Sequence, residues 1–334
     1  MNWSFVQRAQ IFRLAEAGGL APAQLARAAA CGPLQPAPDE WRRMLDRLLA
    51  FGGALLLGAG VVFFFAWNWD ALHRFAKFGL AAAALLACGV TALWATPRGI
   101  AFRAALFGAC IATGALLALI GQTYQTGADV WELFAAWAAL MLPFVLLSRS
   151  AASWTLWLAV ANMALLRALS QAGAMGLWGY LDGLFGLYSL LLVAGLNLVV
   201  LLAFECLGRW LLVDAQRWMA RLAALGVVAP LCVAAVSGWF EADFRPGLMV
   251  FVLAVLAGSA VYGPWRRDVA ILALLVYAAI AVLTAGLLRV LDSFDFLALN
   301  VLGLFVILAS SAAGWGLMRL HRESGEAGGR RSGS

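Results

Sequence analysis

The stretch Leu48–Trp67, LLAFGGALLLGAGVVFFFAW, contains no charged side chain. About 20 helical residues cross the roughly 30 Å hydrocarbon core of a bilayer, because a helix satisfies every backbone N–H and C=O within its own segment. The stretch is apolar on every face, whereas a membrane β-strand alternates apolar and polar residues. It therefore predicts a transmembrane helix.

Similar apolar segments recur as far as Met318 in this chain, in which 64% of the 334 residues are hydrophobic and 12% are charged. A soluble domain carries about 25% charged residues. We therefore predict an all-α fold, a polytopic transmembrane helical bundle of about ten spans preceded by a short N-terminal cytoplasmic helical region. The predicted spans are residues 48–67, 75–96, 101–120, 131–147, 151–169, 184–204, 222–240, 246–263, 268–288 and 297–318.

Lysine and arginine predict the orientation of these spans. With the N-terminus in the cytoplasm, all but five of the 23 basic residues fall in cytoplasmic segments. The five are Arg74, Lys77, Arg167, Arg245 and Arg289. Cytoplasmic loops generally carry the excess of basic residues, so both termini are predicted to be cytoplasmic. The net charge of +6 then reflects orientation in the bilayer, and no nucleic-acid partner is expected.

The chain divides into three predicted parts: residues 1–47, 48–320 and 321–334. The first is a cytoplasmic region of short helices with a proline-rich linker, and the second is the transmembrane domain. The third is rich in glycine, serine and arginine, which predicts a disordered cytoplasmic tail. The N-terminal helices are interpreted either as a docking module for a protein partner or as an amphipathic anchor without a specific partner.

The segment Arg209–Arg221 interleaves tryptophan and leucine with arginine. This pattern predicts a helix that lies in the membrane interface, with its arginines at the lipid headgroups. Within the spans, Gly58 and Gly114 belong to pairs of small residues that favour close helix contacts. Asn162, Asn197 and Asn300 are expected to form hydrogen bonds between helices, worth about 1 kcal/mol each.

Two short connections on the predicted outer side are rich in polar residues, and they form a candidate outer-face cluster. Amides, a phenol and carboxylates beside an aromatic side chain suit a sugar, a lipid headgroup or a cation. The alternative is structural: the glutamines bond turn backbone, Asp129 caps the next span, and Asp70 pairs with Arg74. The members of the cluster are Asn68, Asp70, Gln122, Tyr124, Gln125, Asp129 and Trp131.

Two stretches in the first half of the chain carry a family resemblance: Phe63–Asp70, FFFAWNWD, and Gly121–Gln125, GQTYQ, followed by Asp129 and Trp131. With the later Trp137, Leu142 and Pro143, they resemble a family of predicted bacterial membrane proteins that is catalogued as domain of unknown function 2157. The resemblance covers roughly residues 10–165. It implies a bacterial inner-membrane protein of several spans, but no activity and no catalytic residues.

Known sites of chemistry are missing from the sequence. There is no phosphate-binding glycine loop, no His-Glu-x-x-His and no Gly-x-Ser-x-Gly, so no catalytic residue, metal or other cofactor is expected. Our first hypothesis is a non-catalytic membrane component that works with a protein partner. A small-molecule transporter is favoured if Asn162, Asn197 and Asn300 line one cavity. An enzyme acting on a lipid-linked or glycan substrate is favoured if Asp70 and Asp129 share a cleft with Gln122 and Tyr124.

Overall fold

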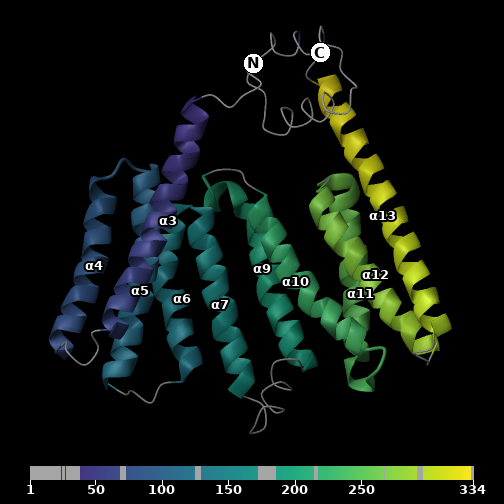
Figure 1. The fold of residues 1–334 in the computed structure, drawn as a ribbon, viewed down its shortest axis with the longest axis horizontal. Coiled ribbons are helices and arrows are strands. Elements are labelled where there is room, and N and C mark those ends of the chain that lie inside the picture. Colours follow the sequence, from purple (N-terminus) through teal and green to yellow (C-terminus); the bar gives the residue numbers. More distant parts are fainter. Residues whose placement is uncertain are drawn as a thin grey trace. The chain divides into compact units, whose positions relative to one another are not determined.

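The structure is a computed structural model that describes residues 24, 27, 38–67, 73–124, 129–171, 186–213, 217–266, 268–291 and 296–331. The chain separates into two compact units, Met1–Ala112 and Thr113–Ser334, which are treated separately below. Figure 1 shows the helices of both. Most of the predicted N-terminal cytoplasmic region lies outside the described residues.

Each predicted span corresponds to a helix whose ends differ from the prediction by a few residues, except where noted below. In chain order the helices are α3 (Pro38–Trp67), α4 (Arg74–Trp94), α5 (Ile100–Tyr124), α6 (Val130–Ser148), α7 (Ala151–Gln171), α9 (Leu187–Leu211), α10 (Trp218–Ser237), α11 (Arg245–Ala260), α12 (Val269–Leu291) and α13 (Phe296–Arg331). A short 3₁₀ turn, η1 (Ala242–Phe244), precedes α11, and a π-helical turn, η2 (Val261–Trp265), continues it.

The membrane prediction is confirmed by the length and composition of these helices. Nine candidate spans lie within the described residues, one for each long helix from α4 onward, with η1 and η2 extending that of α11. The helix α3 covers the first predicted span and also includes residues 38–47. The chain is therefore a polytopic membrane protein with an all-helical fold.

Small residues bring helices together in both units. In the first, a Cβ on Gly58 of α3 would lie 2.7 Å from the Ile111 side chain of α5, and Phe51 meets Phe107 edge-on with ring centroids 5.7 Å apart. In the second, a Cβ on Gly114 would overlap the Trp137 ring. Both predicted glycine contacts are confirmed, since neither position has room for a side chain.

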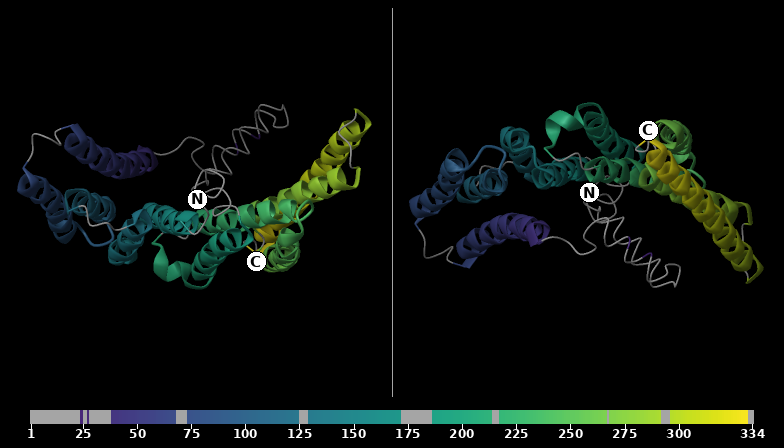
Figure 2. Two further views of the ribbon diagram at one scale, coloured as in Figure 1. Left: turned by 90° about the horizontal axis from the view of Figure 1, so that it is seen from below. Right: turned by 90° about the horizontal axis from the view of Figure 1, so that it is seen from above.

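The core of the second unit surrounds α10, which contacts α9, α11 and α12. Half of the apolar stretch of α10 is buried, whereas in α13 the only buried side chain among those that the structure describes is Ala298. Alanine, valine, leucine and methionine supply the buried face of α10, with Met219, Ala223 and Ala234 fully covered. At the end of this array α13 packs against α12, as Figure 2 also shows. Its remaining apolar surface is exposed for contact with lipid.

The prediction of an interfacial helix at Arg209–Arg221 is wrong. Instead α9 continues to Leu211, the chain is extended at Leu212, and α10 begins at Trp218. The alternation of apolar and basic residues arises because the segment contains the end of one span and the start of the next. Two of its arginines, Arg217 and Arg221, bind Asp268, the acid directly before α12.

The C-terminal end also differs from the prediction. The helix α13 runs to Arg331, past the end of its candidate span at Arg319, and so continues through most of the tail predicted to be disordered. No proline interrupts the sequence between these residues, so the hydrogen-bond ladder of the helix can extend beyond the apolar segment.

Candidate functional site

The structure describes only part of the predicted outer-face cluster: Asn68, Asp70 and Gln125 lie outside the described residues. Gln122 and Tyr124 are exposed in the last turn of α5. Asp129 is at the N-cap position of α6, but its side chain makes no capping hydrogen bond, and Trp131 is half-buried in the first turn of that helix. The convergence of these residues on one site stays a prediction.

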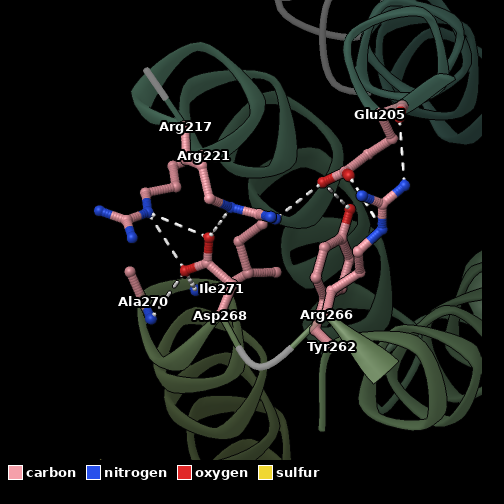
Figure 3. A network of polar contacts seen from close by, with 8 residues as sticks. All are labelled: Glu205, Arg217, Arg221, Tyr262, Arg266, Asp268, Ala270 and Ile271. Atoms are coloured by element: carbon pink, nitrogen blue, oxygen red, sulfur yellow. Dashed lines mark hydrogen bonds and ion pairs between the residues drawn. The ribbon is translucent and has the colours of Figure 1, made fainter. Parts of the chain in front are cut away.

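Six other residues form a connected network that joins α9, α10, η2 and the start of α12. We call it the carboxylate–arginine cluster, and Figure 3 shows it from close by. It contains two acids, three arginines and one tyrosine. Its members are Glu205, Arg217, Arg221, Tyr262, Arg266 and Asp268.

Asp268 is the fully buried acid of this cluster, with a side-chain exposure of 0%. Arg217 Nε lies 2.7 Å from its Oδ2, and Arg221 Nε lies 3.1 Å from its Oδ1. The backbone N–H groups of Ala270 and Ile271 donate to the same Oδ1 at 3.2 and 3.5 Å. Asp268 therefore caps the N-terminus of α12 and joins it to α10.

Glu205, near the end of α9, accepts hydrogen bonds from other side chains of the cluster. Arg217 Nη2 and the Tyr262 hydroxyl both donate to Glu205 Oε1 at 3.1 Å. Arg266 Nε lies 3.4 Å from Glu205 Oε2, and Arg266 Nη2 donates to the Glu205 carbonyl oxygen at 3.1 Å. Arg217 thus bridges the two acids, and the cluster ties the α9–α10 connection to the α11–α12 connection.

Local sequence explains how these side chains meet. The π-helical turn η2 contains Pro264, which lacks an N–H and so favours an altered ladder at the end of α11. The backbone N–H of Asp268 bonds the Tyr262 carbonyl oxygen at 3.2 Å, which closes the turn before α12. On the facing helix, Arg217 and Arg221 are one turn apart at the start of α10, so both reach the same carboxylate.

Burial alone would raise the pKa of Asp268, because it disfavours the charged form. The hydrogen bonds and charges of Arg217 and Arg221 outweigh this and hold the pKa below its ordinary value. Asp268 is therefore ionised at neutral pH and accepts hydrogen bonds on both oxygens. A carboxylate held in this way acts as a structural anchor for arginine rather than as a base.

A second contact lies at the turn between α6 and α7. Arg149 has a left-handed backbone with φ of 47°, and its guanidinium donates to the carbonyl oxygens of Arg209 and Leu212 at the end of α9. The Arg149 carbonyl oxygen accepts the N–H of Val213 at 3.0 Å, and Trp154 Nε1 donates to Leu211 O at 3.1 Å. A cation is favourable here because helix C-termini expose unbonded carbonyls.

These contacts place three connections at one end of the second unit: α6–α7, α9–α10 and α11–α12. All three were predicted to lie on the same side of the membrane. In these connections Arg149 bonds the end of a neighbouring helix, and Arg217 and Arg221 bond the acid that precedes α12. The end that they form is called the Arg149 end below.

Near the middle of α7 and α9, Asn162 and Asn197 bond each other. Asn197 Nδ2 donates to Asn162 Oδ1 at 2.8 Å, and the reciprocal contact is 3.4 Å. Each also donates at 2.8 Å to the carbonyl oxygen four residues earlier. The predicted hydrogen bond between helices is confirmed for this pair. For Asn300 it is not, because Asn300 donates at 2.6 Å to Phe296 O in its own helix.

Sequence analysis missed Asp268, the central residue of the carboxylate–arginine cluster. Its signal was an acid directly before the apolar run of α12, which is typical of an N-cap. The pairing of that acid with arginines about 50 residues earlier depends on the packing of α10 against α12. Among the residues that the structure describes, no group of three His, Cys, Asp or Glu side chains is placed to hold a metal ion.

Comparison with known proteins supports the family resemblance. Residues 12–154 match the family model described as predicted membrane protein (DUF2157). The resemblance seen in the sequence is thereby confirmed for this part of the chain. No curated protein and no solved structure matches the chain. The carboxylate–arginine cluster lies outside the matched residues.

Proposed function

We propose that this chain is a non-catalytic component of the bacterial inner membrane that works with a protein partner through its N-terminal cytoplasmic helices. The observation that supports this best is the way in which its polar side chains are used. The acids of the carboxylate–arginine cluster and the Asn162–Asn197 pair bond residues of neighbouring helices. Such groups hold a helical bundle together, and they leave partner binding to the segments outside it.

The proposed orientation places the Arg149 end in the cytoplasm, together with both termini. Basic residues favour the cytoplasmic side, and the three arginine-bearing connections share one end of the second unit. A transporter is less well supported, because Asn162 and Asn197 satisfy each other and Asn300 bonds its own helix.

Cysteine labelling tests the orientation. A membrane-impermeant maleimide applied to intact spheroplasts should leave the protein unlabelled, because Cys31 and Cys206 would face the cytoplasm. After permeabilisation the exposed Cys206 should react, and Cys206→Ser should reduce that signal. Labelling of Cys206 in intact spheroplasts would reverse the proposed orientation.

Cross-linking in cells tests the partner. The full chain and a variant that lacks residues 1–37 would carry the same C-terminal tag and be purified from cross-linked membranes. We expect a discrete adduct with the full chain that the truncated variant does not form. The control is membrane insertion, followed through labelling at Cys206, which must be equal for both. An adduct of equal yield in both would contradict the role of the N-terminal helices.

A further inference from the structure

The carboxylate–arginine cluster holds more arginine donors than its acids bind. Its three arginines face two carboxylates, so the cluster has a surplus of one positive charge. Arg221 contacts Asp268 through Nε, at 3.1 and 3.3 Å from the two carboxylate oxygens. Figure 3 shows the two terminal nitrogens of Arg221 directed away from Asp268.

The acids of the cluster are buried, and its arginines are partly exposed. The side chains of Asp268 and Glu205 are 0% and 13% exposed, whereas those of Arg217, Arg221 and Arg266 are between 38% and 48% exposed. The acids therefore lie behind the guanidinium groups and hold them in place. An incoming molecule meets the positive face first.

Two exposed tryptophans lie in the same connections as the cluster. Trp265 directly precedes Arg266 and is 81% exposed, and Trp210, at the end of α9, is 75% exposed. The candidate spans end at Leu211 and Trp265 and begin again at Trp218 and Val269, so the cluster lies at the level where the apolar helices stop. Exposed tryptophan beside arginine at this level is typical of the interface between acyl chains and headgroups.

We propose that the arginines of this cluster, with Arg221 as the principal donor, bind the phosphate of an anionic phospholipid headgroup. An arginine presents two parallel N–H groups that match phosphate oxygens. The bond from Nε to the buried Asp268 fixes the plane of the Arg221 guanidinium, so less side-chain entropy is lost on binding. The exposed tryptophans favour a lipid over a soluble phosphate, since they offer apolar surface to acyl chains.

This inference goes beyond the proposed function and does not depend on the N-terminal partner. It concerns the second unit alone, and it gives a role to arginines that the buried acids hold at the surface. Lipid bound here would contact α9, α10 and η2 together, the same elements that the two acids connect.

Native mass spectrometry of the full chain tests the proposal. The protein in neutral detergent would be titrated with phosphatidylglycerol or with phosphatidylcholine of the same acyl chains. We expect phosphatidylglycerol to bind more tightly, and Arg221→Gln to weaken it about tenfold, as for the loss of a charged hydrogen bond. Arg289→Gln is the matched control, because it removes the same charge from the last turn of α12, at its other end.

A second variant separates binding from folding. Arg221→Lys keeps the positive charge but lacks the planar fork, so it should fold like the unmodified chain and bind phosphatidylglycerol with intermediate affinity. Equal weakening by Arg221→Gln and Arg289→Gln, or no weakening by Arg221→Gln, would overturn the proposal.

Glycerol 3-phosphate distinguishes the two sources of phosphate. It carries a phosphate but no acyl chain, so it should compete with phosphatidylglycerol only at far higher concentration. If it binds as tightly as the lipid, and loses affinity in Arg221→Gln, the ligand is a soluble phosphate and the assignment to lipid is wrong.

Discussion

The carboxylate–arginine cluster and the Asn162–Asn197 pair are two polar sites in the same unit, and they differ in charge and depth. The cluster holds two acids and three arginines where the candidate spans end. The asparagine pair is neutral and lies within the spans of α7 and α9. Both connect helices, but they do so in different surroundings.

The difference follows from the energy of placing charge in lipid. An ionised side chain at the centre of a bilayer is expensive, whereas a neutral amide is tolerated when its hydrogen bonds are made. At the span ends, headgroups and water solvate the outer faces of the arginines. There a buried acid can gather several donors, so the cluster should contribute more to stability than the asparagine pair.

Removing the buried acid is the strongest test of this comparison. Asp268→Ala leaves Arg217 and Arg221 without their common partner and removes the N-cap of α12. Breaking a buried ion pair costs about 3–5 kcal/mol, and the partial exposure of both arginines should keep the loss of stability at about 3 kcal/mol. The free energy of unfolding, from titration with SDS in mixed micelles, measures it.

Asp243→Ala is the control for that loss, because Asp243 is an exposed acid in η1 at the other end of α11. A surface substitution of this kind changes stability by about 0.5 kcal/mol or less. If the two variants lose the same stability, the cluster is not a tie between α10 and α12.

A smaller loss of stability is expected from a substitution where α10 packs against the Asn162–Asn197 pair. A Cβ on Gly226 would overlap Asn197 Oδ1, and Asn197 is held there by Asn162 and by Val193 O. Gly226→Ala should therefore cost about 1–3 kcal/mol, as overpacking does. In α9, Gly195 has nothing within 4 Å of the same added atom. Gly195→Ala should keep the stability of the unmodified chain, and an equal loss would contradict the close contact.

The asparagine pair itself is measured by a double-mutant cycle. Asn162→Ala and Asn197→Ala, singly and together, should give a coupling of about 0.6–1.7 kcal/mol, the average and the maximum found for hydrogen bonds between membrane helices. The control cycle pairs Asn162→Ala with Asn300→Ala. Its coupling should be close to zero, because Asn300 bonds Phe296 O within α13. A coupling as large as that of the first cycle would place Asn300 in the same network.

The same comparison shows what the sequence can predict. Hydropathy predicted the approximate position of each helix of the bundle, because a membrane span must be long and apolar whatever it packs against. It also indicated that an asparagine in a span needs a partner, which Asn162 and Asn197 supply to each other. It did not reveal which asparagines would meet, and Asn300 stays within its own helix.

Where the chain leaves the apolar spans, the prediction was less successful. The alternation of apolar and basic residues at Arg209–Arg221 is compatible with an interfacial helix. In the structure, however, Arg217 and Arg221 bond the buried Asp268 at the start of α12. Such a pairing depends on the neighbours of α10, and periodicity along one segment does not contain that information. Of the candidate outer-face cluster, Gln122, Tyr124, Asp129 and Trp131 are placed at the ends of α5 and α6, and their joint role remains a prediction.

The smallest expected effect comes with pH, and it distinguishes the charged site from the neutral one. The pKa of Asp268 is lowered from its ordinary value of 3.8 by the hydrogen bonds of Arg217 and Arg221, which outweigh its burial. A lowered pKa adds stability that is complete above the ordinary value and is lost as pH falls through the folded value. The difference in unfolding free energy between the unmodified chain and Asp268→Asn should thus stay constant from neutral pH down to the ordinary value.

Below that value the difference should narrow, because protonation then removes in the unmodified chain the charge that Asp268→Asn already lacks. The effect is smaller than that of Asp268→Ala, since a protonated Asp268 can still accept the N–H groups of Ala270 and Ile271. The asparagine variants should show no such narrowing, because neither Asn162 nor Asn197 titrates. A difference that instead widens as pH falls from pH 6 to pH 5, a window above an ordinary carboxyl pKa of about 4, would mean that burial prevails over the arginines and raises the pKa of Asp268, because an acid with a raised pKa adds stability as it is protonated.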